Sequence, residues 1–234
     1  MKKFIFPLFI LILVSCQKGS SSNPKTNASA SSTPGSGVTD VNGKTYKTIK
    51  IGKQEWMAEN LDVTTYNDKT PIKESKHDLE WMEHITQWLG FKEAVWHNRD
   101  GLIQYGKIYN GYVVESEKKV CPTGWHIPSK IEWETLINTV GGEQDAGTSL
   151  KQAGYQNWKK TNWSNAYDTA TNSSGFTAIP NVRVSDGMYV ATISAWYWTS
   201  DLTMISIDNE SPFVGINDDK EHLTDAAAIR CIKN

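Results

Sequence analysis

Strand-forming runs alternate with turn dipeptides at the start of the folded part of the chain, over residues 38–61. The turns are marked by Asn42-Gly43 and Gly52-Lys53, and the runs between them are rich in Thr, Tyr, Ile and Val. Asn-Gly readily adopts the positive φ angles of a tight hairpin turn, and β-branched and aromatic residues favour strands. The segment therefore predicts an antiparallel β-meander.

An amphipathic helix is predicted to follow Ser129. Ser129 and Glu132 have the spacing of a capping box, in which each side chain binds an exposed amide at the helix start. The apolar residues that share one helical face are Trp133, Leu136, Ile137 and Val140, and Gly141-Gly142 ends the helix. We interpret Trp133 as a core residue. Residues 78–91 predict a second, short helix that Gly90 ends.

The chain beyond residue 180 has the pattern of short strands. These segments are 182–192 with an Asp186-Gly187 turn, 194–201, 211–218 and 226–234, and Asp218-Asp219 is expected at a hairpin tip. Residues 146–180 form a long polar loop with aromatic residues, and such loops either serve a function or hold themselves together by packing. Strands with one or two helices predict an α+β fold in a single domain.

The N-terminus has the features of an export signal. A positive start, Met1-Lys2-Lys3, precedes a continuous apolar run over residues 4–14, which is too short to span a bilayer. The run ends in Leu13-Val14-Ser15-Cys16, which resembles the lipobox of bacterial lipoproteins. We expect a signal peptide over residues 1–15 and lipidation of Cys16; the alternative is an ordinary signal peptide.

Acyl chains on Cys16 would provide the attachment to a lipid bilayer. Gln17 is not the Asp that favours inner-membrane retention in enteric bacteria, so an outer-membrane location is expected. Residues 17–37 consist almost entirely of Gly, Ser, Asn, Pro, Thr and Ala, a composition typical of a flexible tether. The predicted organisation is a signal peptide, a lipidated Cys16 with a linker over 16–37, and a domain over 38–234.

Composition limits the possible partners. With 234 residues, 38% hydrophobic and 21% charged, the chain can bury a core. The formal net charge of −2 gives no field that would attract phosphates, so nucleic acid is not expected as a partner. The unusual feature of the composition is its ten tryptophans, a residue that occurs both in hydrophobic cores and at binding surfaces.

Two cysteines remain besides Cys16. Export to an oxidising compartment favours a disulfide between Cys121 and Cys231. The alternative is a reactive or metal-binding thiol pair, for which His126 is the nearest candidate partner.

Patterns for metal and catalytic chemistry are absent from the sequence. The histidines are scattered at His77, His84, His97, His126 and His222. Acidic and amide residues at 208–210 and 217–219 could offer oxygens to calcium, but they lack EF-hand spacing and are better explained as solvated turns. The sequence has no Walker A motif, no GxSxG motif and no GxGxxG ahead of a helix. We therefore expect no cofactor and a non-catalytic protein.

Seven sequence blocks, in order, resemble the Fibrobacter succinogenes major paralogous domain, a family of exported and often lipid-anchored proteins. The blocks lie at 38–61, 66–68 (YND), 105–110 (YGKIYN), 121–133 (CPTGWHIPSKIEW), 172–180 (NSSGFTAIP), 197–200 (YWTS) and 229–234 (IRCIKN). The pattern is also similar to the C-type-lectin-like and sulfatase-modifying-factor folds, through Ile127-Pro128-Ser129, Glu132-Trp133 and Arg230-Cys231. The resemblance implies a C-type-lectin-like domain.

The chain departs from the family pattern at three places, Asn110-Gly111-Tyr112, Asn181-Val182-Arg183 and Ala226-Ala227-Ala228. These departures affect any ligand-binding face that the family's aromatic residues would form, so the chain resembles a divergent member.

The function expected from these patterns is binding. A non-catalytic, lipid-anchored envelope protein would bind an extracellular glycan or protein through Trp158, Trp163 and Tyr167, since flat rings stack on sugars. The alternatives are that these rings pack the loop onto the domain, and that the protein is a structural envelope component that recognises a neighbouring protein. An oxidase of the sulfatase-modifying type and a carbohydrate hydrolase are weaker alternatives.

Overall fold

A computed structural model describes most of the folded part of the chain. The described residues are 31–75, 94–97, 106–154, 158, 170–181, 183–185, 188–190, 194–208 and 210–234. The predicted signal peptide, Cys16, the linker up to residue 30 and the predicted helix over 78–91 lie outside them. Within the described part, none of the helices has the length and apolar character that a membrane crossing requires.

Two sheets and a small hairpin form an α+β fold in which most strand pairs are antiparallel, as predicted. The smaller sheet has the order β1 (Ser32–Pro34), β4 (Thr48–Ile51), β5 (Gln54–Met57), β16 (Ile232–Lys233) and β9 (Trp125–His126). β4 and β5 form a hairpin around Gly52, whose φ of 59° suits the predicted turn. β2 (Val38–Thr39) and β3 (Thr45–Tyr46) pair around the Asn42-Gly43 turn. Both predicted turns therefore join antiparallel hairpins, but the hairpins belong to different sheets, so the predicted continuous β-meander is confirmed only in part.

The larger sheet has nine strands. Seven follow the order β14-β13-β12-β15-β8-β7-β6, and β10 pairs with β11 and β15. The strands are β6 (Lys73–Ser75), β7 (Val95–His97), β8 (Ile108–Asn110), β10 (Arg183–Ser185), β11 (Met188–Val190), β12 (Ala195–Trp198), β13 (Met204–Ile207), β14 (Val214–Ile216) and β15 (Ala226–Ala228). Each of the four predicted strand segments beyond residue 180 contains at least one strand. β13 lies between the predicted segments 194–201 and 211–218 and was not predicted.

The predicted hairpin tip at Asp218-Asp219 is wrong. Within the described residues, β14 pairs with β13, while β15 lies between β8 on one edge and β10 and β12 on the other. The segment after residue 218 therefore enters the middle of the sheet instead of folding back on β14. Turn residues do not signal such non-local pairing.

The capping-box helix is confirmed as α3 (Lys130–Thr139). The Ser129 side chain accepts from Glu132 N, and the Glu132 carboxylate accepts from Ser129 N at 2.7 Å. Two single-turn helices, α2 (Gly111–Glu115) and α4 (Ala146–Leu150), were not predicted, and α4 begins the segment that was predicted as a long loop.

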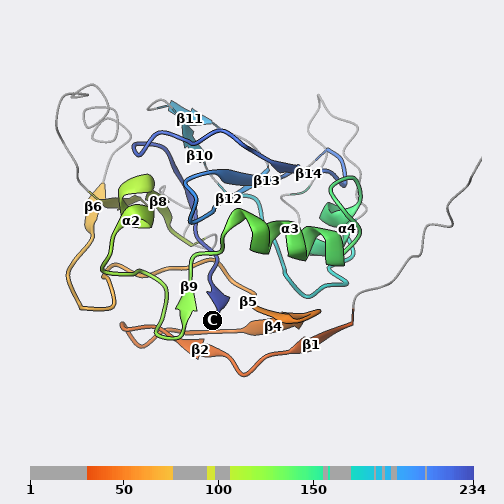
Figure 1. Cartoon of the computed structure of the whole chain (residues 1–234), viewed down its shortest axis with the longest axis horizontal. Helices are drawn as coiled ribbons and strands as arrows, with labels where there is room; N and C mark the ends of the chain where they lie inside the picture. The colour runs from red at the N-terminus through yellow and green to blue at the C-terminus, as the bar shows by residue number, and fades with distance from the viewer. Residues whose placement is uncertain are drawn as a thin grey trace, which may run out of the picture.

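In Figure 1, α3 lies between the two sheets, and the first hydrophobic cluster contains residues of α3 and of both sheets. Its centre is a set of rings: Trp133 of α3 lies 4.8 Å from Trp56 of β5 and 5.4 Å from Tyr197 of β12, centroid to centroid. Trp133 is fully buried, which confirms its interpretation as a core residue. A second cluster includes Trp198, Cys121 and Cys231.

Arg230 lies where the chain crosses from the larger sheet to the smaller one, between β15 and β16. Its guanidinium is completely buried and donates to Asn60 Oδ1 and to the carbonyls of Phe176 and Thr177. The guanidinium carbon also lies 4.3 Å from the Phe176 ring centroid. The buried Arg230 side chain therefore connects the segment between β15 and β16 to residue 60 and to residues 176–177.

The predicted linker ends earlier than expected. Residues 32–34, predicted as part of the 16–37 linker, form β1, which pairs with β4 from Ser32–Ile51 to Pro34–Ile49. Backbone hydrogen bonds order this stretch although its composition is typical of a flexible chain. The folded part therefore includes residues that precede the predicted boundary at 38.

Candidate functional site

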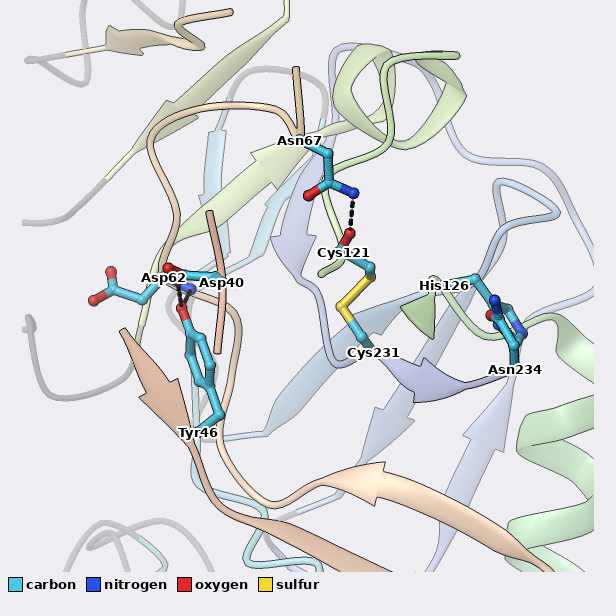
Figure 2. Close-up of a disulfide and its surroundings, with 8 residues drawn as sticks. All are labelled: Asp40, Tyr46, Asp62, Asn67, Cys121, His126, Cys231 and Asn234. Atoms are coloured by element: carbon cyan, nitrogen blue, oxygen red, sulfur yellow. Dashed lines mark hydrogen bonds between the residues drawn. A yellow bond between two sulfur atoms is a disulfide. The ribbon is translucent and has the colours of Figure 1, made fainter. Parts of the chain in front are cut away.

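The predicted disulfide joins Cys121 to Cys231 (Figure 2). The two Cα atoms lie 5.9 Å apart, and the cysteines are separated by 110 residues in sequence. Both cysteines are buried, and Asn67 Nδ2 donates to the Cys121 carbonyl. The pairing confirms the disulfide and removes both sulfurs as nucleophiles or metal ligands.

Tyr46 belongs to a polar group near the disulfide (Figure 2). Its hydroxyl donates to Asp40 Oδ2 at 2.7 Å and accepts from Asp62 N at 3.1 Å. Burial, aided by the hydrogen bond to Asp40, raises the pKa of Tyr46 far above its usual range. Burial would also raise the pKa of Asp62, but hydrogen bonds from Lys107 and Lys44 lower it overall. These groups satisfy one another, so their role is structural.

His126 has an oxygen beside each ring nitrogen. Nδ1 lies 2.7 Å from Asn234 Oδ1, and Nε2 lies 2.9 Å from Glu132 Oε1, so neither nitrogen is directed to an open position. His126 thus links α3 to the end of the smaller sheet. Among the residues that the structure describes, no group of three or more His, Cys, Asp or Glu could hold a metal ion.

Trp158 is a core residue. Only 3% of its surface is exposed, and its indole nitrogen donates to the Ala178 carbonyl at 3.3 Å. Lys151 Nζ lies 5.2 Å from the ring centroid and donates to the Ser211 carbonyl, and burial lowers the pKa of Lys151 to about 8. This placement corrects the prediction of Trp158 as a surface contact. Trp163 and Tyr167 lie outside the described residues.

A different aromatic residue, Trp196, is half-buried and has polar neighbours. Arg183 of β10 lies over the Trp196 ring of β12, with its guanidinium carbon 4.5 Å from the ring centroid. Arg183 also donates to Glu221 at 2.7 Å, and Asn217 donates to the other Glu221 oxygen at 3.2 Å. Asn181 Oδ1 accepts from the Trp196 backbone nitrogen at 2.9 Å. We call these five residues the Arg183 cluster.

The Arg183 cluster is partly exposed. The side chains of Arg183 and Glu221 are 14% and 15% exposed, and Trp196 and Asn217 are half-buried. Across the described residues, Arg183 Nε and Asn181 Nδ2 are buried without a hydrogen-bond partner, although buried donors are normally satisfied. Those two donors are not accessible to a ligand, so the groups that could contact one are the partly exposed Trp196 ring and the side chains of Arg183, Glu221 and Asn217.

Glu221 has an altered acidity in this setting. Burial raises the pKa of its carboxyl group; the Arg183 charge opposes this effect, and the nearby Asp225 carboxyl adds to it. Glu221 therefore has a stronger tendency to take up a proton than an exposed glutamate.

Strand pairing brings the Arg183 cluster together. β8 occupies one edge of β15, so β10 and β12 share the other edge, with Val184 opposite Ala226 and Tyr197 opposite Ala228. This arrangement places Arg183 beside Trp196. Sequence analysis did not identify the cluster, because its members belong to three separate segments and no local spacing relates them.

These features define a disulfide-closed α+β domain. A family model described as the Fibrobacter succinogenes major domain matches residues 49–233. The chain belongs to this family, which confirms the resemblance drawn from its sequence blocks. Searches of curated proteins and of solved structures give no match.

Proposed function

We propose that the chain is an exported, lipid-anchored envelope protein that binds an extracellular glycan without catalysing a reaction on it. The observation that carries the binding part is the Arg183 cluster, with a ring, a guanidinium, a carboxylate and an amide on one surface. The export part is supported by the buried disulfide, since structural disulfides persist in oxidising compartments. An outer-membrane location and a C-type-lectin-like assignment of the fold are part of the proposal.

Lipidation of Cys16 is testable in a bacterial host that processes lipoproteins. Cells that express the chain and grow with a palmitate analogue should yield a labelled protein in the membrane fraction. The Cys16→Ala variant should lose the label, because the acylated sulfur is removed. The matched control is Ser15→Ala, which keeps a small residue before the cysteine and should still be labelled. Label that persists in the Cys16→Ala protein would overturn the lipid anchor.

The chemistry of the cluster suits a sugar. Pyranose rings present an apolar face and pairs of hydroxyl groups. An indole ring packs against the apolar face of the sugar. Planar carboxylate, amide and guanidinium groups bind pairs of sugar hydroxyls with two hydrogen bonds each. Arg183 holds one side of the Trp196 ring and fixes the Glu221 carboxylate, so these three groups are preorganised. Preorganisation reduces the entropy lost on binding.

Binding is testable with the exported chain on an array of plant, host and bacterial glycans. We expect Trp196→Ala to reduce the affinity for any bound glycan by at least about tenfold, as expected for a central aromatic contact. Phe213→Ala removes another partly exposed aromatic side chain, at 38% exposure, and should leave binding unchanged. An unchanged thermal transition would show that both variants remain folded.

Two results would contradict the glycan site. The first is equal binding by wild type and the Trp196→Ala variant. The second is the absence of binding to every glycan, which would favour the alternative of a structural envelope component that recognises a neighbouring protein. Cross-linking in intact cells, followed by identification of the joined partner, would then test that alternative.

A further inference from the structure

The end of the tether docks on the folded domain through a small set of polar contacts. After β1, Gly35 N donates to the Thr48 carbonyl at 2.9 Å and Gly37 N donates to Thr48 Oγ1 at 2.9 Å. Ser36 N donates to Glu55 Oε1 at 3.2 Å. We call residues 32–37 the strap, because they lie across the outer edge of β4 (Figure 1).

The surface that receives the strap is built from buried polar groups. Thr48 and Glu55 are only 6% and 8% exposed. Thr48 Oγ1 donates to Glu55 Oε1 at 2.9 Å, and Lys233 Nζ holds the other carboxylate oxygen at 3.0 Å. Burial would raise the pKa of Glu55, but the hydrogen bonds from Lys233, Thr48 and Ser36 lower it overall, so the carboxylate stays charged. The contacts of Glu55 with Thr48 and Lys233 come from outside the strap, so they can hold the carboxylate when the strap is absent.

This receptor surface selects a glycine. A Cβ atom added at Gly35 would collide with Thr48 Oγ1 and with the Glu55 carboxylate. Neither group can move aside easily, because each is hydrogen-bonded and buried. The surface thus recognises an extended segment with a glycine at one defined position.

The strap itself has little apolar attachment. None of residues 31–37 is buried. On the paired strand, β4, both Thr48 and Ile51 are buried. Segments held by hydrogen bonds with few buried apolar contacts open at a lower free-energy cost than the core. Release of the strap would leave an unpaired β4 edge, and such edges pair readily with another strand.

The strap precedes the region that the family model matches. The matched region begins at residue 49, after the strap. Every copy of the chain carries both the strap and its receptor.

We propose that the strap is exchangeable: when it detaches, the β4 edge and the Thr48–Glu55 receptor of one copy bind the strap of a second copy. Two copies paired in this way would exchange identical contacts, and because β2 begins at Val38, directly after the strap, the two domains would lie close together. The proposal concerns a surface away from the Arg183 cluster and does not depend on the proposed glycan binding.

Engineered cysteines test the exchange, because Thr33 lies opposite Lys50 and both are exposed. The full chain would be used with Cys16→Ala, so that the introduced thiols are the free ones beside the Cys121–Cys231 disulfide. A mixture of Thr33→Cys and Lys50→Cys chains should give a covalent mixed dimer after oxidation. Thr33→Cys mixed with Lys53→Cys, an exposed residue beyond the β1–β4 register, measures random collision.

Gly35→Val in the Thr33→Cys chain should lower the yield of mixed dimer at least about fivefold, because its strap no longer fits the receptor. Ser36→Val is the matched control: it adds the same side chain at an exposed position and should leave the yield unchanged. A yield no higher than the collision control, or equal yields from the Gly35→Val and Ser36→Val chains, would overturn strand exchange.

Hydrogen exchange of the unmodified chain provides a second measurement that does not depend on any variant. The amides of Gly35, Ser36 and Gly37 should exchange at least about tenfold faster than the paired amides of β4 and β5, through local opening. If the strap amides exchange only through global unfolding, the strap is a fixed strand and the proposal fails.

Discussion

Replacement of both Cys121 and Cys231 by alanine is expected to lower the free energy of unfolding by about 4–5 kcal/mol. The disulfide closes a loop of 110 residues, and cross-links that close long loops remove the most conformational entropy from the unfolded chain. The two cysteines are also fully packed in the second cluster, so the variant loses part of the core as well. Denaturant unfolding of the two purified proteins measures the difference.

A control with reduced wild-type protein separates the effect of the lost cross-link on the free energy of unfolding from the effect of lost core packing. Wild-type protein unfolded in the presence of a reductant keeps both sulfur atoms but lacks the link, and it should show most of the same loss. A loss below about 1 kcal/mol in both experiments would contradict the prediction, and would mean that the unfolded chain is already restricted in the region that the disulfide closes.

Replacement of Arg230 by lysine is expected to lower the free energy of unfolding by about 3–5 kcal/mol. The guanidinium donates to one side-chain amide and two backbone carbonyls, and removal of a partner from a buried charged network leaves the other groups unsatisfied. Lysine keeps the charge but cannot reproduce the planar arrangement of donors.

The Arg230 contacts also hold a strained backbone. Thr177 has a φ of 59°, which is unfavourable for a β-branched residue, and Asn172 Oδ1 accepts from its backbone nitrogen at 2.8 Å. With Arg230 replaced, the loop is expected to relax, and amide exchange of residues 174–178 should accelerate together with the loss of stability.

Lys118→Met serves as the comparison for Arg230. Lys118 forms an exposed ion pair with Asp68 at 3.9 Å, and exposed pairs contribute little. Its replacement should change the free energy of unfolding by less than about 0.5 kcal/mol. Equal effects of the Lys118 and Arg230 replacements would contradict a structural role for the buried guanidinium.

Local signals predicted the parts of the fold that depend on neighbours in sequence. The Ser129–Glu132 capping box and the turns at Asn42-Gly43 and Gly52-Lys53 are contained within a few residues, and the structure has the helix and the hairpins there. The disulfide followed from the number of cysteines and the expected compartment, without geometry.

The rest depends on contacts between distant segments. The strap has the composition of a linker, and it is ordered by Thr48 and Glu55, which no local pattern relates to it. Arg230 is a charged residue in an otherwise apolar segment between β15 and β16, and it is buried because acceptors from residues 60 and 176–177 bind it. Trp158 has polar neighbours in sequence, yet the segment at 178 supplies the carbonyl that its indole needs.

The position of the last two strands has a consequence for the order of folding. β15 lies in the middle of the larger sheet, and β16 lies between β5 and β9 in the smaller one. Neither sheet can close until residues 226–233 are available, although α3 and the β4–β5 hairpin need only their own neighbours. A chain that emerges N-terminus first from a ribosome or a translocation channel therefore stays open until its final segment arrives. Such late closure is compatible with export in an unfolded state.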